Sequence, residues 1–310
     1  MTDLTTVSGA ALSKLTFGTM QFGGTADAAA SEAMYHAARD AGINHFDTAV
    51  GYTGGNAEKL LGPMVQRHRD DIYLATKVAY AGGASRQNIT AHFDRCRLQL
   101  GVDQIDLLYL HRFDDDTALE ETFSTMAALQ DAGHIRHIGV SNYAAWQVMK
   151  AQAVAKTLGT RIDVIQPMYS LVKRQAEVEI FPMAVDQDIR IVPYSPLGGG
   201  LLTGKYAKGE EGRLTTDEGY RARYDVSWMH DCAAALSEIA DALGTHPATL
   251  AVAWAARHPA APSPIISARA VAQLMPSLAA EGFMMDDALY RRITALSVTP
   301  PPATDRLEEA

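Results

Sequence analysis

Short, continuously apolar runs alternate with longer amphipathic stretches along almost the whole chain. Continuous apolar runs are typical of parallel strands that are buried on both faces. In the longer stretches the apolar residues recur at helical spacing, as Ile89, Phe93, Cys96 and Leu100 do. The pattern therefore predicts repeated strand-and-helix units, with strands at 15–18, 42–47, 72–76, 105–110, 135–140, 164–166, 189–193 and 263–266.

Eight is the number of strands that closes into a (β/α)8 TIM barrel, and an open doubly wound sheet is the structural alternative. We expect one barrel domain over residues 1–310, with extra helices near the C-terminus and an extended tail from about residue 300. The turn at Gly9 predicts a small β-hairpin that plugs the amino-terminal end of the barrel. The expected helices are 28–41, 56–67, 86–100, 119–132, 144–158, 176–187, 231–243, 247–257, 270–278 and 286–296.

Composition narrows the class of protein. With 310 residues, of which 47% are hydrophobic, the chain can bury a large core. Its formal net charge of −9 and the lack of a basic run argue against nucleic acid or an anionic membrane as a partner. Cys96 and Cys232 lack redox or metal-ligand spacing, and neither a signal peptide nor a membrane-spanning run is present. We therefore expect a soluble cytoplasmic protein with two buried thiols and no metal site.

Titratable side chains follow three consecutive predicted strands. Asp47, Lys77 and His111 end the second, third and fourth strands, and Tyr52 lies in the loop after Asp47. Each alone has an ordinary explanation as a helix cap, a solvated cation, a satisfied imidazole or a half-buried packing residue. In a parallel barrel, however, the carboxyl ends of the strands meet at one mouth, where such enzymes keep their catalytic groups. We therefore predict that these four side chains form one active site.

A glycine-rich segment, residues 196–206, follows the seventh predicted strand. Gly199 and Lys205 fit the spacing of a nucleoside-triphosphate loop, but Tyr206 stands where a Ser or Thr must hold magnesium. Thr203 stands where a dinucleotide-binding fingerprint needs its third glycine. Both fingerprints therefore fail. What remains is a turn whose backbone amides can approach phosphate oxygens, with a merely flexible loop as the alternative.

A hydroxyl and two carboxamides follow the fifth and sixth strands. They belong to Ser141, Asn142 and Gln166. Such groups can pair with a ligand that itself carries a carboxamide, such as nicotinamide. The alternative is that Ser141 and Asn142 only cap the next helix.

With these residues in view, the chain resembles the aldo-keto reductase superfamily over nearly its whole length. Arg112, directly after His111, and residues 120–122 resemble the branch that contains potassium-channel β subunits and related bacterial reductases, whereas aldose reductases commonly carry Trp after the histidine. The segments that carry the resemblance are 44–49 with Tyr52, 58–62, 75–77, 105–111, 139–142, 166–169 and 194–200.

The resemblance implies a barrel that binds a nicotinamide dinucleotide without a Rossmann domain and reduces aldehyde or ketone carbonyls by hydride transfer. It implies that Tyr52 donates the proton, that Lys77 and Asp47 tune its pKa, and that His111, as a neutral donor, orients the carbonyl. Because a nearby ammonium favours phenolate, we expect Lys77 to lower the pKa of Tyr52 from about 10 toward the operating range. The matching cofactor contacts are Ser141, Asn142 and Gln166 at the carboxamide, Tyr194 under the nicotinamide ring, and Ser195, Leu197 and Gly199 along the pyrophosphate.

The loop after the eighth predicted strand departs from the family pattern. The family commonly has a Gly before this loop and a Glu-Asn pair at its far end, whereas this chain has Ser267 and then Pro276-Ser277. The resemblance therefore does not predict which residues contact the adenine. Arg269 and Gln273 match the contacts to a 2′-phosphate. No acidic residue occurs in 267–280 to accept a free ribose hydroxyl, so NADP(H) is favoured over NAD(H).

Three functions fit these observations. The first is an NAD(P)H-dependent carbonyl reductase, and the second is a sugar or alcohol dehydrogenase on the same scaffold. The third is a cofactor-sensing regulatory subunit, which the presence of all four predicted catalytic residues makes less favourable. The expected partner is a small carbonyl or alcohol, and the oligomeric state stays open. The loops expected to select the substrate are 20–23, 78–80, 112–113 and 205–228.

Overall fold

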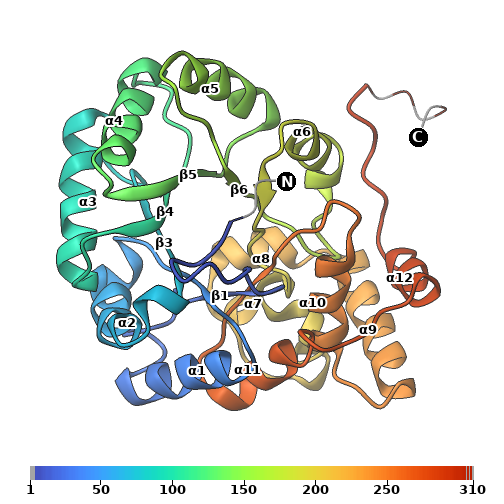
Figure 1. Cartoon of the computed structure of the whole chain (residues 1–310). Helices are drawn as coiled ribbons and strands as arrows, with labels where there is room; N and C mark the ends of the chain where they lie inside the picture. The colour runs from blue at the N-terminus through green and yellow to red at the C-terminus, as the bar shows by residue number, and fades with distance from the viewer. Residues whose placement is uncertain (1–3, 305, 307, 309–310) are drawn as a thin grey trace.

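The computed structural model describes residues 4–304, 306 and 308 and shows parallel strands surrounded by helices (Figure 1). Its eight-stranded sheet has the order β7-β6-β5-β4-β3-β2-β1-β8. Two backbone hydrogen bonds close it, from Ser263 N to Ile191 O at 2.9 Å and from Ile265 N to Pro193 O at 2.8 Å. The barrel prediction is therefore confirmed. The strands are β1 (Thr16–Gly18), β2 (His45–Asp47), β3 (Tyr73–Val78), β4 (Ile105–Leu110), β5 (Ile135–Ser141), β6 (Val164–Gln166), β7 (Arg190–Ile191) and β8 (Ile265–Ile266).

The strands divide their side chains between two apolar layers. Tyr73 and Ala75 of β3 belong to the cluster inside the barrel, together with Leu107 and Tyr109 of β4. The intervening Leu74 belongs to the larger cluster between the barrel and its helices. Because successive side chains of a strand point to opposite faces, every position of β3 and β4 is buried, as their continuous hydrophobic pattern predicts.

The expected helices form around the barrel, and local signals fix several of their ends. Ser85 accepts a hydrogen bond from Asn88 N before the third helix, and Gly101 ends that helix in the left-handed region at φ 63°. The helices are α1 (Ala28–Asp40), α2 (Asn56–Gln66), α3 (Arg86–Leu100), α4 (Leu119–Asp131), α5 (Ala145–Thr157), α6 (Ile180–Asp186), α7 (Arg213–Thr216), α8 (Glu218–Tyr224), α9 (Ser227–Ala242), α10 (Pro247–Arg257), α11 (Val271–Leu278) and α12 (Asp287–Thr294).

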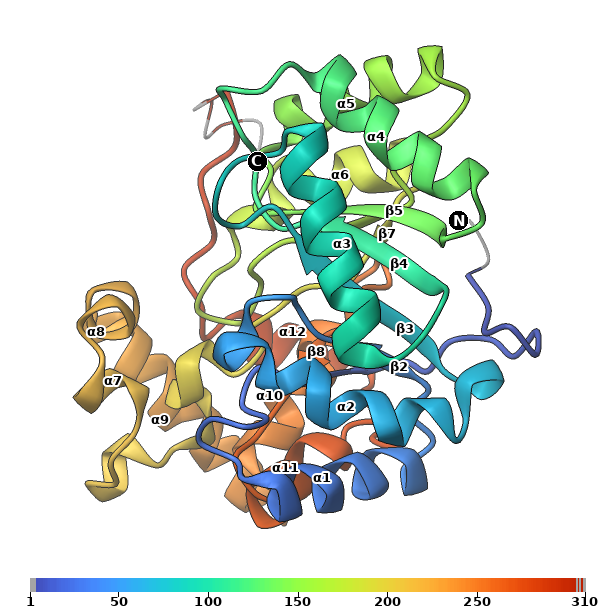
Figure 2. The same cartoon turned by 90° about the vertical axis from the view of Figure 1, so that its left-hand side faces the viewer.

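Two expectations about helices were wrong. The helix predicted over 176–187 is divided into a 3-10 turn, η3 (Gln175–Glu177), and α6. Pro182 explains the division, because it has no N–H to bond within a longer helix but is tolerated in the first turn of α6. The polar stretch 205–228 was expected to be a loop, yet it contains α7 and α8. In Figure 2 these two helices lie on the opposite side of the barrel from the N-terminus.

The ends of the chain are only partly described. Thr5 and Ala11 form an isolated antiparallel bridge around Gly9, and a plug at this end of the barrel stays a prediction. Residues 301–304 contain neither helix nor strand. The rest of the expected extended tail falls partly outside the described residues, as do residues 1–3. Both cysteines are free and buried, as predicted.

Candidate active site

The predicted catalytic residues lie at the carboxyl ends of neighbouring strands. Asp47 ends β2 and is paired in register with Ala75 of β3. Lys77 lies near the end of β3, opposite Tyr109 of β4, and His111 directly follows β4. The barrel therefore brings these side chains together at one mouth, as their positions after successive strands predict.

Lys77 is the best-shielded charge of the site, with an exposed fraction of 0%. Its ammonium donates to Asp47 Oδ1 and, at 2.7 Å, to the carbonyl oxygen of Thr48. Burial alone would lower the pKa of Lys77, but Asp47 and Tyr52 outweigh burial and raise it above the ordinary lysine value. Lys77 is therefore held protonated within the barrel.

Tyr52 and His111 cover this buried ion pair. The 3-10 turn η1 (Tyr52–Gly55) places the Tyr52 ring centroid 4.9 Å from Lys77 Nζ. The His111 ring meets the Tyr52 ring edge-on, with centroids 5.8 Å apart. Burial, and secondarily Lys77, lowers the pKa of His111 to about 3. His111 is therefore neutral at physiological pH, as predicted, and can donate one hydrogen bond.

Lys77 lowers the pKa of Tyr52, as predicted, but it does not bring that pKa below the ordinary value. Burial raises the pKa of the Tyr52 phenol above its ordinary value, and Lys77 only partly offsets this rise, while Asp47 adds to it. The reason is that a buried phenolate would lose its hydration. In addition, the ammonium of Lys77 is already paired with the carboxylate of Asp47, which weakens its effect on Tyr52. Tyr52 therefore keeps its proton over the whole physiological range.

The predicted carboxamide contacts lie beside the ion pair. Gln166 ends β6 and donates from Nε2 to Asp47 Oδ2 at 2.9 Å, across 119 residues of sequence. Ser141 ends β5 and donates to the backbone oxygen of Gln166 at 2.9 Å. Asn142 donates to the His111 carbonyl oxygen at 2.9 Å and accepts the Tyr194 hydroxyl at 2.7 Å. These contacts connect the ends of strands β4 to β7.

The alternative of helix capping by Ser141 and Asn142 fails. The helix that follows, α5, starts at Ala145, and its N-cap is Ala144. Asn142 instead adopts the left-handed region at φ 57°, which is uncommon outside glycine but tolerated by Asn. The two polar side chains therefore belong to the barrel mouth.

The glycine-rich segment after β7 forms the 3-10 element η4 (Gly198–Thr203). Gly199 has φ 67°, and a Cβ there would lie 2.8 Å from a ring carbon of Tyr220 in α8. Ser195, just before η4, also has a positive φ, of 62°. Glycine is needed at 199 because α8 packs closely onto a left-handed turn. The predicted residues Ser195, Leu197 and Gly199 thus lie together in one turn.

The loop after β8 carries the two residues predicted at a 2′-phosphate. Arg269 donates from its backbone N–H to Gln273 Oε1 at 3.4 Å, and its guanidinium has no hydrogen bond or ion pair with the described residues. Burial and then the charge of Arg269 lower the pKa of Lys205. Two cations from distant segments are therefore near each other. The buried hydroxyl of Ser267 lacks a partner among the described residues.

One residue of the mouth escaped the sequence analysis. Tyr109 is fully buried inside the barrel, with its ring centroid 5.8 Å from Lys77 Nζ. Gly139 on β5 leaves room for this ring, because a Cβ there would collide with it. The signal that could have found Tyr109 is alternation along 105–110, which points it to the same side as Leu107.

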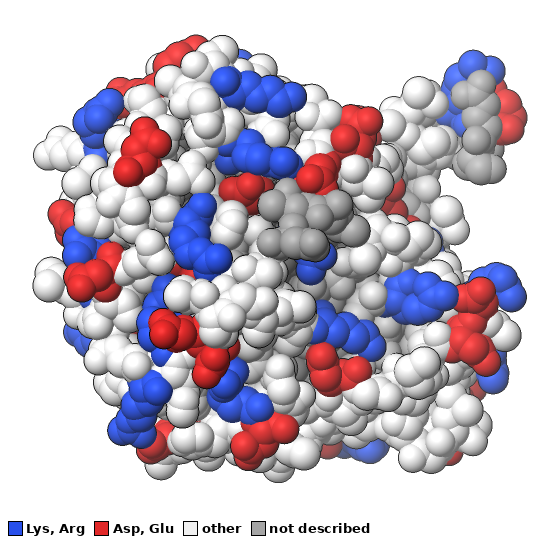
Figure 3. Space-filling model, viewed as in Figure 1, with Lys and Arg blue, Asp and Glu red and all other residues white. Residues whose placement is uncertain are grey.

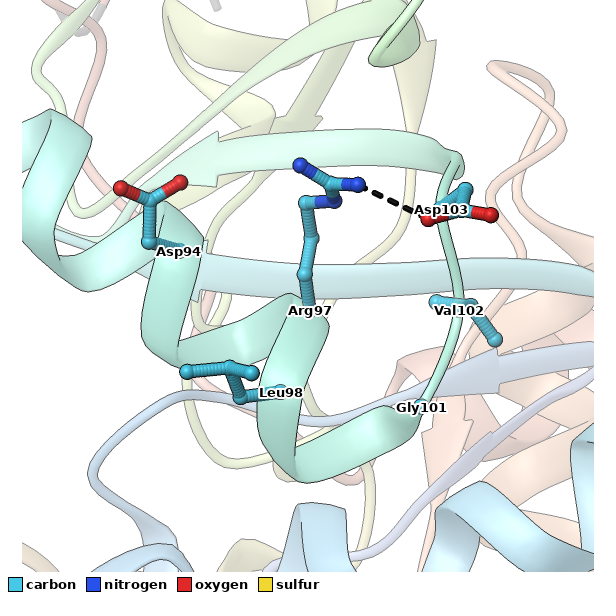
Figure 4. A pocket seen from close by; sticks show the side chains of 6 residues that line it. All are labelled: Asp94, Arg97, Leu98, Gly101, Val102 and Asp103. Atoms are coloured by element: carbon cyan, nitrogen blue, oxygen red, sulfur yellow. Dashed lines mark hydrogen bonds and ion pairs between the residues drawn. The ribbon is translucent and has the colours of Figure 1, made fainter.

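A groove elsewhere on the surface is not part of this site. Figure 4 shows that it lies at the end of α3, where Arg97 pairs with Asp103 at 2.8 Å. Because β4 starts at Ile105, the groove belongs to the amino-terminal side of the strands, away from His111. Within the described ranges, no group of three or more His, Cys, Asp or Glu side chains is arranged to hold a metal ion.

Charges of both signs are mixed on one face of the molecule (Figure 3). Figure 3 shows Lys and Arg side chains interspersed with Asp and Glu, without a continuous basic patch. Among the described helices, none combines the length and apolar character needed to cross a membrane.

The structure is a closed parallel barrel. At its carboxyl mouth lie a buried Lys–Asp pair, a Tyr and a neutral His, and this combination of fold and side chains points to one family of proteins. The chain belongs to the aldo/keto reductase family, whose model matches residues 14–298. Membership of this family, with relatives named as oxidoreductases, makes the protein an oxidoreductase.

Its relatives span both enzymes and a channel subunit. The chain is 33% identical to a probable voltage-gated potassium channel subunit beta of Arabidopsis thaliana, over 88% of each chain. It is 31% identical to the uncharacterized oxidoreductase YrpG of Bacillus subtilis, over 94% of each chain. It is 33% identical to aflatoxin B1 aldehyde reductase member 2 of Rattus norvegicus, over 77% of this chain and 69% of the relative. The predicted branch of the family is confirmed.

Proposed function

We propose that this protein reduces aldehydes or ketones to alcohols with a nicotinamide cofactor, and that Tyr52 donates the proton. The observation that carries the proposal is the fully buried Lys77–Asp47 pair beneath Tyr52. When bound, the reduced cofactor supplies a hydride to the carbonyl carbon. The oxygen then needs a proton and electrostatic stabilisation, which Tyr52, Lys77 and His111 can provide.

Each of these residues has a separate task in the proposed reaction. Tyr52 carries a proton at physiological pH, because the ordinary pKa of a phenol is about 10 and burial raises the pKa of Tyr52 further. The ammonium of Lys77 stabilises the phenolate that remains after transfer, and Asp47 keeps that ammonium charged and oriented. Neutral His111 donates a hydrogen bond to the carbonyl oxygen. Positioned acid catalysis of this kind typically contributes about a hundred- to ten-thousand-fold in rate.

The residues at the mouth fit a nicotinamide dinucleotide. Gln166, Ser141 and Asn142 would hold the carboxamide, and the Tyr194 ring would lie against the nicotinamide. Ser195, Leu197 and Gly199 would follow the pyrophosphate through the backbone of the turn at η4. The unpartnered buried hydroxyl of Ser267 supports the fit, because a bound ligand would satisfy it.

We further infer a preference for NADPH over NADH. A 2′-phosphate is a compact dianion, and Arg269 offers an unpaired planar fork of donors with Lys205 nearby. Replacing Arg269 with Ala should weaken NADPH binding by about tenfold or more, the scale of a charge-assisted hydrogen bond, and NADH binding far less. Fluorescence titration of both cofactors tests this. Equal weakening of the two cofactors, or tighter NADH binding by the wild type, contradicts the preference.

The proton donor can be tested with Tyr52→Phe. The ring still packs over Lys77, so the variant should bind the reduced cofactor but lose most carbonyl reduction, by about a hundredfold or more. Steady-state oxidation of the cofactor with a generic aldehyde measures the loss, and binding titration is the control. Turnover and a pH profile like those of the wild type would remove Tyr52 from this role.

Lys77→Met should reduce carbonyl reduction at least as much as Tyr52→Phe does, because it also leaves Asp47 buried and unpaired.

A second candidate is a cofactor-binding regulatory subunit, which the relative named as a potassium channel subunit beta favours. The two functions differ in turnover. A regulator would bind the reduced cofactor without oxidising it faster in the presence of any aldehyde, whereas the proposed enzyme would show turnover that depends on Tyr52. A panel of carbonyl compounds assayed with both reduced cofactors separates them.

A further inference from the structure

A row of rings leads outward from the proposed catalytic residues to a cation. The His111 ring lies between Tyr52, at 5.8 Å, and Tyr80, at 4.9 Å. The guanidinium of Arg112 lies over the outermost ring, that of Tyr80, 5.4 Å from its centroid. Tyr80 follows β3 and Arg112 follows β4, so the row belongs to the barrel mouth. A positive charge therefore lies one ring away from His111, on the far side of the Tyr80 contact.

The backbone holds Tyr80 in this position at a conformational cost. Ala79 is buried and has φ 62°, a region that costs an L-residue with a Cβ about 1 kcal/mol. Its N–H donates to His92 Nδ1 at 3.2 Å, which fixes this conformation. Tyr80 consequently turns away from the core and is 59% exposed. A large aromatic ring at this level of exposure is available to a ligand as well as to Arg112.

Inside the protein the charge of Arg112 has only a minor effect: the hydrogen bond from Thr117 chiefly lowers the pKa of Asp114, and Arg112 adds to this. Arg112 is exposed, and its side chain makes no ion pair or hydrogen bond with the described residues. Asp114 is instead hydrogen-bonded to other groups: its Oδ2 accepts from Ala84 N at 2.7 Å and from Thr117 Oγ1 at 2.6 Å. Stacking on Tyr80 uses one face of the guanidinium and leaves the N–H donors in its plane free.

We propose that Arg112, supported by Tyr80, selects carbonyl substrates that carry a carboxylate at the end remote from the carbonyl group. This inference rests on the proposed reductase function. A planar guanidinium edge matches a carboxylate through two parallel hydrogen bonds, and Tyr80 orients that edge. The protein as a whole is strongly acidic, with a formal net charge of −9, so an anionic substrate needs such a local cation. His111, next to Arg112 in the sequence, receives the carbonyl.

The test compares two substrates of nearly the same shape, one anionic and one neutral, across a set of variants. We would measure kcat/KM for 4-carboxybenzaldehyde and for the neutral 4-formylbenzamide with the wild type, Arg112→Gln, Arg112→Lys and Arg292→Gln. Arg292 is an exposed arginine of α12 and serves as the matched control for loss of one positive charge. Circular dichroism and thermal unfolding check that each variant is folded.

We expect the ratio of acid to amide to fall about tenfold in Arg112→Gln, through a rise in KM for the acid, since a partly exposed charge-assisted bond is of this scale. Arg112→Lys should keep part of the ratio, Arg292→Gln all of it, and added salt should reduce the wild-type ratio. A ratio unchanged in Arg112→Gln, or lowered equally in Arg292→Gln, overturns the inference. If the wild type reduces neither aldehyde, the proposed function fails instead.

Discussion

At the scale of single residues, burial and the counter-charges beside a group together decide which titratable groups carry charge. Lys77 and His111 face the same mouth, yet Lys77 stays charged because Asp47 accepts from it, whereas burial and then the charge of Lys77 keep His111 neutral. His45, two residues before Asp47, follows the same rule. It is 1% exposed, its Nδ1 pairs with Thr16 Oγ1 at 2.9 Å, and burial lowers its pKa to about 3.

His45 should make stability depend on pH. Below about pH 6.5 the unfolded chain protonates His45, while the folded chain does so only below about 3. The unfolded state therefore binds more protons in this window, and the free energy of unfolding falls as the pH falls, by about 2 kcal/mol from this residue at pH 5. Urea unfolding at pH 7 and pH 5 should show a smaller difference for His45→Gln than for the wild type. The exposed His36→Gln is the control, and an unchanged difference in His45→Gln would refute the assignment.

At the scale of elements, close approach of backbones fixes how the helices pack. Gly62 of α2 faces the end of α3, where a Cβ would lie 2.8 Å from the carbonyl carbon of Leu100 and 2.9 Å from its Cα. The contact that a side chain would meet is backbone, which cannot rotate away as a flexible side chain can. Gln66 of α2 also donates to the Leu100 carbonyl oxygen, at 2.9 Å. The α2–α3 contact therefore depends on glycine at 62.

Gly62→Ala should lower the free energy of unfolding by about 1–3 kcal/mol, because the added methyl group overpacks the contact and forces α2 away from α3. Urea denaturation measures the loss. Gly282→Ala is the control, since a Cβ there meets nothing within 4 Å and Gly282 does not have a positive φ. If Gly62→Ala were as stable as Gly282→Ala, the helices would have to be packed less tightly than described.

At the scale of the whole molecule, one buried carboxylate joins several strands at the amino-terminal end of the barrel. Asp106 of β4 is 0% exposed and pairs with Arg69 at 2.7 Å and with Arg136 of β5 at 2.6 Å. It also accepts from Leu74 N on β3 at 2.9 Å. These bonds hold β3, β4 and β5 together at the end of the barrel opposite the candidate active site.

Asp106→Asn should lower the free energy of unfolding by about 3 kcal/mol or more, because it leaves two partly buried guanidinium groups without their counter-charge. Thermal or urea unfolding measures this. The control is Asp103→Asn, which removes the fully exposed carboxylate of the Arg97–Asp103 pair of Figure 4 and should cause little change. Equal effects of the two substitutions on the free energy of unfolding would mean that the ion pairs of Asp106 do not stabilise the barrel.

The sequence by itself determined the order of the eight strands and the titratable residues that follow them at the mouth. Strand β4 and helix α10 have the predicted ends, because a continuous apolar run and a proline in the first turn are local signals. Asp47, Lys77 and His111 were identifiable because a parallel barrel carries the end of every strand to one side. Local chemistry and topology sufficed for both.

Only the tertiary structure decided what these residues do to one another. Gln166 reaches Asp47 across 119 residues, and no local pattern predicts that bond. The raised pKa of Tyr52 depends on how deeply neighbouring elements bury the phenol, which the sequence does not state. Helices α7 and α8 form in a polar stretch without an apolar helical repeat, and Tyr224 of α8 is fully buried against the rest of the fold. Pairing, burial and packing arise between segments, so they appear only once the chain is folded.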